Sequence, residues 1–126
     1  MKAICFWNFL GAGIFGFLVN LPIVSYYEIG TALTANHAHG AMMGVYGFMA
    51  LGLGMFALRY LIPEDKWPER LAKVSFWSLN IGLAWMCFAT LLPLGILGAV
   101  GYGVNEAIGP QIQQLNARFD EAVRRN

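Results

Sequence analysis

The sequence predicts an all-α integral membrane protein, a bundle of three transmembrane helices followed by a C-terminal amphipathic helix. Its 126 residues are 58% hydrophobic and only 12% charged, whereas a soluble domain carries roughly 25% charged residues. Three stretches contain almost no charge, and each exceeds the roughly 20 residues that cross a hydrocarbon core. No strand alternation is present, which excludes a membrane barrel. We expect a three-helix unit over residues 1–105 and a polar tail over residues 106–126.

The first apolar stretch, Ala3–Tyr27, contains no charged residue. Pro22 lies late in this stretch and is expected to kink or end the helix, because proline lacks an amide N–H and clashes with the preceding turn. The link to the second stretch is then very short and contains Glu28. Tyr26 and Tyr27 beside it are typical of aromatic residues at a membrane interface.

The second stretch, Ile29–Leu58, is uncharged apart from two histidines, and the third is Val74–Asn105, which Pro93 is expected to bend. Residues 59–73 form the loop between them. This loop holds four basic residues, Arg59, Lys66, Arg70 and Lys73. The first loop holds none, so the positive-inside rule places loop 59–73 and the N-terminus in the cytoplasm, and the tail on the opposite side.

The tail repeats apolar residues at steps of three or four, which predicts an amphipathic helix. Those residues are Ile108, Ile112, Leu115, Phe119 and Val123. Its apolar face is expected to lie on the membrane surface or on the rest of the protein.

Other features carry no separate function. The net charge of +1, without a basic patch, gives no indication of nucleic acid. Cys5 and Cys87 lie in apolar runs and are expected to be buried free thiols. The stretch GAGIFG (residues 11–16) matches a dinucleotide fingerprint, but it lies within a membrane span without the required strand, and its small residues predict a close approach of another helix instead. GAMMG (residues 40–44) predicts a face for close helix packing.

Both histidines of the chain, His37 and His39, lie in the second stretch. Residues two apart differ by about 200° around a helix, so the two imidazoles point to opposite sides and do not chelate one ion together. If the helix starts near Glu28, His37 lies about 13 Å along it, close to the middle of the membrane. Ionisable residues there indicate function. Haem ligation, a proton relay and structural hydrogen bonding remain open from the residues alone.

Three stretches resemble the large catalytic subunit of bacterial nitric oxide reductases, within the haem–copper oxidase superfamily, and in particular the quinol-dependent type. They are FWNFLGAGIFGFLVNLPIVSYYEIGTALTANHAHGAMMGVYG, RYLIP and WPERLAKVSFWSLNIGLAWMCFATLLPLGIL. The likeness runs from about Phe6 to Leu97 and corresponds to the ninth to eleventh helices of the superfamily's twelve-helix core. It implies a bacterial inner-membrane protein.

The resemblance implies a role for each histidine. By position in the family's His-x-His pair, His37 matches the ligand of the high-spin haem b and His39 one ligand of the low-spin haem b. The family reaction joins two nitric oxide molecules, with two electrons and two protons, to nitrous oxide and water, a step of denitrification. Ala38 between the histidines would then be a short link for electrons.

The chain departs from the family pattern at two sites. It has no third histidine, so the ligands of the family's non-haem iron and the second low-spin ligand would come from remaining helices or a second chain. We therefore expect the isolated chain to be inactive. The alternatives are a non-enzymatic membrane bundle with a structural or assembly role, or a segment of an oxygen-reducing haem–copper oxidase.

Overall fold

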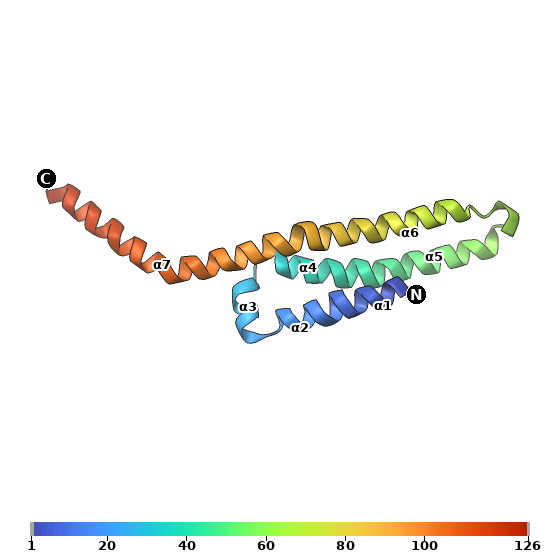
Figure 1. The fold of residues 1–126 in the computed structure, drawn as a ribbon, viewed down its shortest axis with the longest axis horizontal. Coiled ribbons are helices and arrows are strands. Elements are labelled where there is room, and N and C mark those ends of the chain that lie inside the picture. The colour runs from blue at the N-terminus through green and yellow to red at the C-terminus, as the bar shows by residue number, and fades with distance from the viewer. Residues whose placement is uncertain (1, 126) are drawn as a thin grey trace.

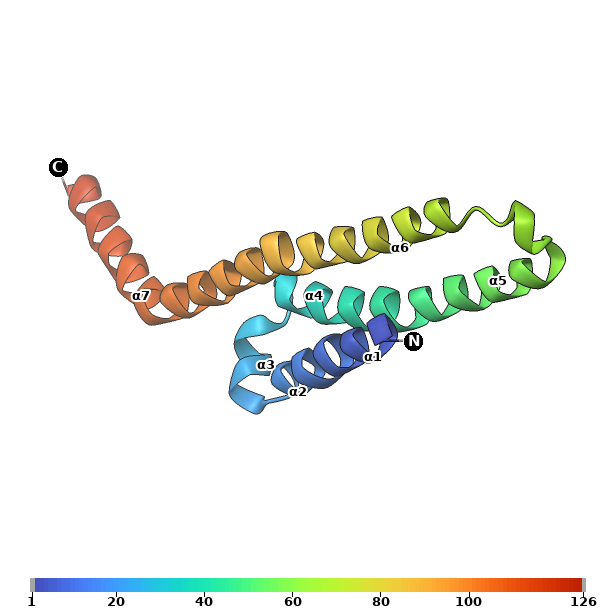
Figure 2. The ribbon, with the colours of Figure 1, turned by 45° about the vertical axis from the view of Figure 1, so that its right-hand side comes forward.

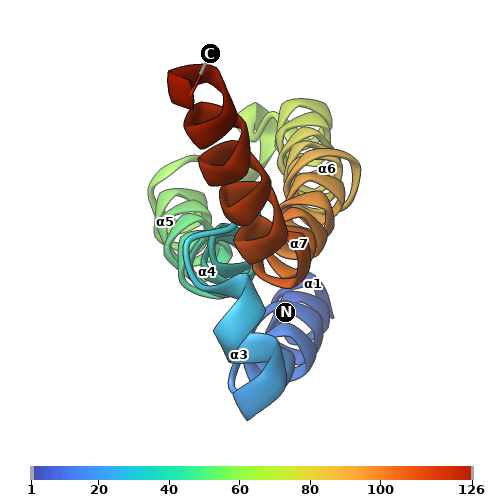
Figure 3. The same ribbon diagram turned by 90° about the vertical axis from the view of Figure 1, so that its left-hand side faces the viewer.

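The computed structural model describes residues 2–125 and contains three helices long and apolar enough to cross a membrane. They are Lys2–Val19, Ala32–Leu61 and Glu69–Arg125, with 18, 30 and 57 residues. Figure 1 shows the three spans side by side in alternating directions, and the end-on view of Figure 3 places them at the corners of a triangle. The described residues form no strand. The predicted all-α fold with three spans is therefore confirmed.

Each span is an α-helix interrupted by a wider π-helical segment. In chain order the segments are α1 (Lys2–Trp7), η1 (Asn8–Phe15) and α2 (Gly16–Val19); α4 (Ala32–Ala41), η2 (Met42–Gly47) and α5 (Phe48–Leu61); and α6 (Glu69–Ala84), η4 (Trp85–Leu91) and α7 (Leu92–Arg125). A π-helical turn interrupts the regular backbone hydrogen bonds, and such turns are frequent at functional sites.

The first span is shorter than the apolar stretch that contains it, because Pro22 ends it as predicted. Leu21 is extended, with φ −70° and ψ 131°, which is the conformation that a following proline imposes. Pro22 then begins the short helix α3 (Pro22–Glu28). Figure 2 shows α3 set at an angle to α2, linking the first span to the second.

The second span begins at Ala32, three residues later than the sequence suggested. Gly30 has a φ of 84°, which favours glycine, and the Thr31 side chain caps the helix by accepting a hydrogen bond from the Leu33 amide at 3.2 Å. His37 consequently lies about 8 Å along the helix rather than about 13 Å. The start of the helix is thus corrected, and the position of the histidines relative to the membrane stays a prediction.

The third span continues without a break into the tail. Helix α7 runs through Pro110 to Arg125, and its red end turns away from the bundle in Figure 1. The tail is helical, as its periodicity predicts. The apolar residues of its stripe are 44–67% exposed, so the structure does not show them packed on the rest of the chain.

Trp7, Phe48, Leu83 and Cys87 form the buried core of the bundle. The Trp7 indole Nε1 donates a hydrogen bond to Asn80 Oδ1 at 3.2 Å and so joins the first and third spans. Cys87 is buried as expected, but Cys5 is exposed, because Ile4 and Trp7 form the face of α1 that packs on the core and Cys5 lies outside that face. That part of the prediction was wrong.

Glycines set the distance between the first and second spans. A Cβ added at Gly11 would lie 2.4 Å from the backbone carbon of Gly40, and one added at Gly44 would lie 2.6 Å from Trp7 Cβ. Only residues without a side chain allow this approach. The packing face predicted for GAMMG is therefore confirmed, and it places the helix with the histidines directly against η1.

Candidate functional site

The candidate site lies on α4, where both histidines sit between the Thr31 cap and the close crossing at Gly40. The helix is α-helical over both residues. Because their separation is two residues, the imidazoles leave the helix in different directions, as expected. One faces the first span and the other faces away from the bundle's interior.

His37 faces η1 and α2 and is half-buried. Its Nδ1 lies 2.8 Å from the backbone carbonyl oxygen of Gly11. A carbonyl oxygen only accepts, so Nδ1 carries the hydrogen and donates it. The opposite nitrogen, Nε2, is then unprotonated in the neutral ring and holds a free lone pair. The ring also lies against Gly16, where an added Cβ would be 3.0 Å from His37 Cε1.

His39 is exposed, and its Nδ1 lies 2.7 Å from the carbonyl oxygen of Ala35, one turn earlier. By the same argument Nδ1 donates, and Nε2 is the nitrogen with a free lone pair. The ring borders a shallow groove of about 390 Å³. The groove is lined by Ala38, His39, Met42, Met43 and Gly47.

The two imidazoles do not converge on one centre. Among residues 2–125 no three His, Cys, Asp or Glu side chains lie close enough to hold a metal ion. The described residues therefore offer single imidazole ligands at two separate places. Such ligands suit an iron whose remaining ligands come from elsewhere, as in a haem, and do not suit a metal ion held by protein alone.

The sequence analysis missed two buried polar side chains around α4. The sequence analysis treated Glu28 only as part of the link between the first two spans. In the structure Glu28 is 4% exposed. Its Oε1 accepts a hydrogen bond from Thr34 Oγ1 at 3.4 Å, and its Oε2 has no partner among the described residues. Asn36, next to His37, is 1% exposed, and its Oδ1 is also without a partner there. No periodicity marks either residue as buried, because burial depends on the packing of other helices against α4 and not on the local pattern.

These features define an integral membrane protein whose central helix presents two oriented imidazoles to opposite sides. The family model described as cytochrome c and quinol oxidase polypeptide I matches residues 1–117. The chain belongs to this family of oxidoreductases, the haem–copper oxidases, as the resemblance implied. Membership implies haem and metal cofactors.

Among characterised proteins the chain is similar to a nitric oxide reductase subunit of Stutzerimonas stutzeri. The two are 34% identical over 79 residues, which is 60% of this chain and 17% of the relative. The chain thus matches about one sixth of the length of that relative, and membrane lipid and further helices or subunits are its expected neighbours.

Proposed function

We propose that the chain supplies one axial histidine to each of two haems b in a nitric oxide reductase. His37 binds the high-spin haem and His39 the low-spin haem. The reaction is that of the whole reductase: two nitric oxide molecules, two electrons and two protons give nitrous oxide and water. The proposal rests on the family match, on the likeness to the Stutzerimonas protein and on the orientation of the two imidazoles.

The observation that carries the proposal is the hydrogen bond from His37 Nδ1 to the Gly11 carbonyl at 2.8 Å. A ligating histidine typically donates its other N–H to a carbonyl or carboxylate, which fixes the tautomer and the ring plane and increases the basicity of the ligating nitrogen. Gly11 lies within η1, where the regular hydrogen-bond series is interrupted, and its carbonyl is directed at another helix. Gly16 leaves room beside the ring.

His39 fits the second haem for a related reason. Its Nδ1 is engaged by the Ala35 carbonyl, so Nε2 faces outward, and the neighbouring groove is apolar and flanked by the small residues Ala38 and Gly47. A flat macrocycle approaches a helix most closely over such residues. One helix therefore serves two haems, one on each side.

A haem at each histidine would supply the redox chemistry: substrate binding at the high-spin iron and electron delivery from the low-spin iron. The chain's own part is to orient two imidazoles and to exclude water with its apolar surroundings. We propose a quinol as the electron donor and the bacterial inner membrane as the location, with loop 59–73 in the cytoplasm. The non-haem iron and its ligands would lie on other helices.

A second candidate is an oxygen-reducing oxidase of the same family. The description of the family model, cytochrome c and quinol oxidase, favours it. The same His-x-His geometry would serve both enzymes. The name of the similar Stutzerimonas protein favours the reductase.

Titration of the purified chain in detergent with haem b tests the proposal. Saturable binding, seen as a shifted Soret band, is expected for the unchanged chain and should be lost when His37 and His39 are both replaced by alanine. Equal binding by both proteins would show that the histidines are not the ligands. Unchanged thermal unfolding of the double variant would confirm that it still folds.

A further inference from the structure

An apolar groove runs between α5 and α6, at the end of the bundle farther from α3 and Tyr26. It has a volume of about 490 Å³, within the range of roughly 300–1,000 Å³ typical of small-molecule sites. Its floor is made by the two helices and the start of α1. Lining residues include Ile4, Leu51, Gly52, Met55, Ala72 and Phe76. This groove is separate from the histidines and plays no part in the proposed haem sites.

Charged residues surround the mouth of the groove, where α5 and α6 meet the loop. A second hollow, lined by Arg59, Glu69 and Lys73, shares Gly52 and Trp67 with the apolar groove, so the two hollows are neighbours. An apolar groove therefore lies next to a charged rim, as the apolar acyl chains of a phospholipid lie next to its charged headgroup.

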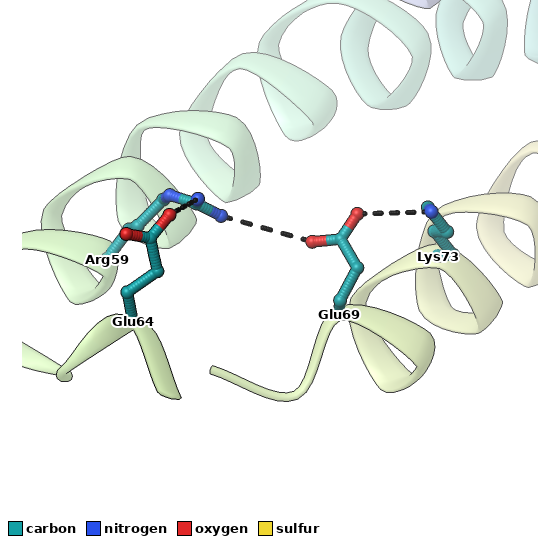
Figure 4. A network of polar contacts seen from close by, with 4 residues as sticks. All are labelled: Arg59, Glu64, Glu69 and Lys73. Carbon is teal, nitrogen blue, oxygen red and sulfur yellow. Dashed lines mark hydrogen bonds and ion pairs between the residues drawn. The ribbon is translucent and has the colours of Figure 1, made fainter. Parts of the chain in front are cut away.

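Figure 4 shows that the two cations of this rim share one carboxylate. Glu69 contacts Lys73 Nζ at 3.3 Å and Arg59 Nη1 at 3.9 Å, and Glu64 lies 3.4 Å from Arg59 Nη2. All four side chains are more than half exposed. Exposed ion pairs of this kind are weak and exchange readily, so both cations remain available to another anion.

We propose that the groove binds one anionic phospholipid, with an acyl chain between α5 and α6 and its phosphate between Arg59 and Lys73. Residues 59–73 carry four basic and three acidic residues, and Lys66, Arg70 and Asp65 form no ion pair within residues 2–125. This end of the bundle therefore has one net positive charge. Trp67, whose ring lies 5.7 Å from the Arg59 guanidinium carbon, marks the level of the membrane interface.

Lipid matches both parts of this surface better than a protein partner does. The groove lies between segments of two helices that are long and apolar enough to cross a membrane. A neighbouring helix would fill the apolar part, but it would leave Arg59 and Lys73 without a new anion. Each basic residue near a membrane surface strengthens the attraction of anionic lipid.

Native mass spectrometry of the full chain, delipidated and then mixed with phosphatidylglycerol or phosphatidylcholine, tests the proposal. One phosphatidylglycerol should be retained per chain, and phosphatidylcholine should be retained much less. The double variant Arg59→Gln/Lys73→Gln should weaken phosphatidylglycerol binding roughly tenfold or more. Arg118→Gln/Arg124→Gln removes the same charge from the tail and should change it little.

A second pair of variants tests the apolar part of the groove. Gly52 lines the groove and Gly54 does not, and a Cβ added at either position meets no atom within 4 Å. Both Gly52→Leu and Gly54→Leu should therefore fold. Only Gly52→Leu should reduce retention of phosphatidylglycerol, because the leucine occupies the space of the acyl chain.

Three outcomes would overturn the proposal. The first is equal retention of both lipids, which indicates only non-specific surrounding lipid. The second is retention of phosphatidylglycerol that is unaffected by Arg59→Gln/Lys73→Gln or by Gly52→Leu. The third is a dimer mass that Gly52→Leu abolishes, which would make a second copy the occupant. Thermal unfolding of each variant without lipid confirms that it is folded.

Discussion

At the scale of single residues, Gly11 has two roles at one place. Its missing side chain lets the second span approach to a distance that no Cβ tolerates, and its carbonyl oxygen accepts the His37 Nδ1 hydrogen. The sequence predicted the first role from the small residues of GAGIFG. The second role joins residues 26 positions apart and depends on the π-helical backbone of η1. No pattern within either stretch could predict it.

Gly11→Ala is expected to destabilise the bundle by about 1–3 kcal/mol, the typical cost of inserting a methyl group into a closely packed site. The added Cβ would lie 2.4 Å from Gly40 backbone, and the spans would have to separate. Unfolding by denaturant in detergent measures this loss. The matched control is Gly13→Ala, where the Cβ meets only the Asn8 carbonyl at 3.5 Å. Equal stability of the two variants would contradict the tight crossing.

At the scale of helices, the sequence predicted the number of spans but not all of their ends. Pro22 ended the first span as expected, since its effect is local. The start of the second span depends on the positive φ of Gly30 and the cap at Thr31, which hydrophobicity alone does not reveal. The continuation of α7 through Pro110 was not foreseen either, because a proline inside a helical pattern usually marks an end.

A hydrogen bond between α3 and α7 gives a test at this scale. The Tyr26 hydroxyl donates to Glu106 Oε1 at 3.0 Å, and this bond, together with the neighbouring Tyr102 hydroxyl and the Glu106 charge, raises the pKa of Tyr26 to about 12. Tyrosinate absorbance should show one tyrosine that titrates late, and Tyr26→Phe should remove it. Glu106→Gln should return its pKa toward 10. Persistence of the late titration in Glu106→Gln would contradict the contact.

The sign of the accompanying stability change follows from the same shift. Because the folded state holds the Tyr26 proton more tightly than the unfolded state, the contribution of this group is fully present below about pH 10. It is lost as the pH rises toward about 12. Tyr26→Phe should abolish this dependence.

At the scale of the whole molecule, the three spans and the charge of their loops predict an orientation in the membrane. Loop 59–73 is expected to face the cytoplasm because of its four basic residues. With Cys5 and Cys87 replaced by alanine, Asp65→Cys should react with an impermeant thiol reagent only after the cells are opened. Gln114→Cys in the tail should react in intact cells. Labelling of Asp65→Cys from outside would refute this topology.

The incomplete ligand set has a consequence for activity. The chain holds two histidines, and the proposed function assigns both to haems, so the ligands of a non-haem iron would come from other helices. We expect the purified chain, loaded with haem b, to produce no nitrous oxide from nitric oxide beyond a free-haem control. Gas chromatography of the headspace measures the product. Production above that control would contradict the expected division of the site between this chain and other helices.

The sequence predicted the divergence of the two histidines, and the structure adds the atoms that orient each ring. Their assignment to different haems remains a prediction. A five-coordinate high-spin haem needs one protein ligand, which His37 supplies, whereas a six-coordinate low-spin haem needs two. The chain alone should therefore favour the high-spin haem.

The optical and electron paramagnetic resonance spectra of the ferric, haem-loaded chain test this central claim most directly. We predict a mainly high-spin signal that His37→Ala abolishes and His39→Ala changes little. Thermal unfolding of each variant ensures that loss of haem is not loss of fold. A haem lost in His39→Ala but kept in His37→Ala would contradict the assignment, and a haem kept in both would contradict ligation by this pair.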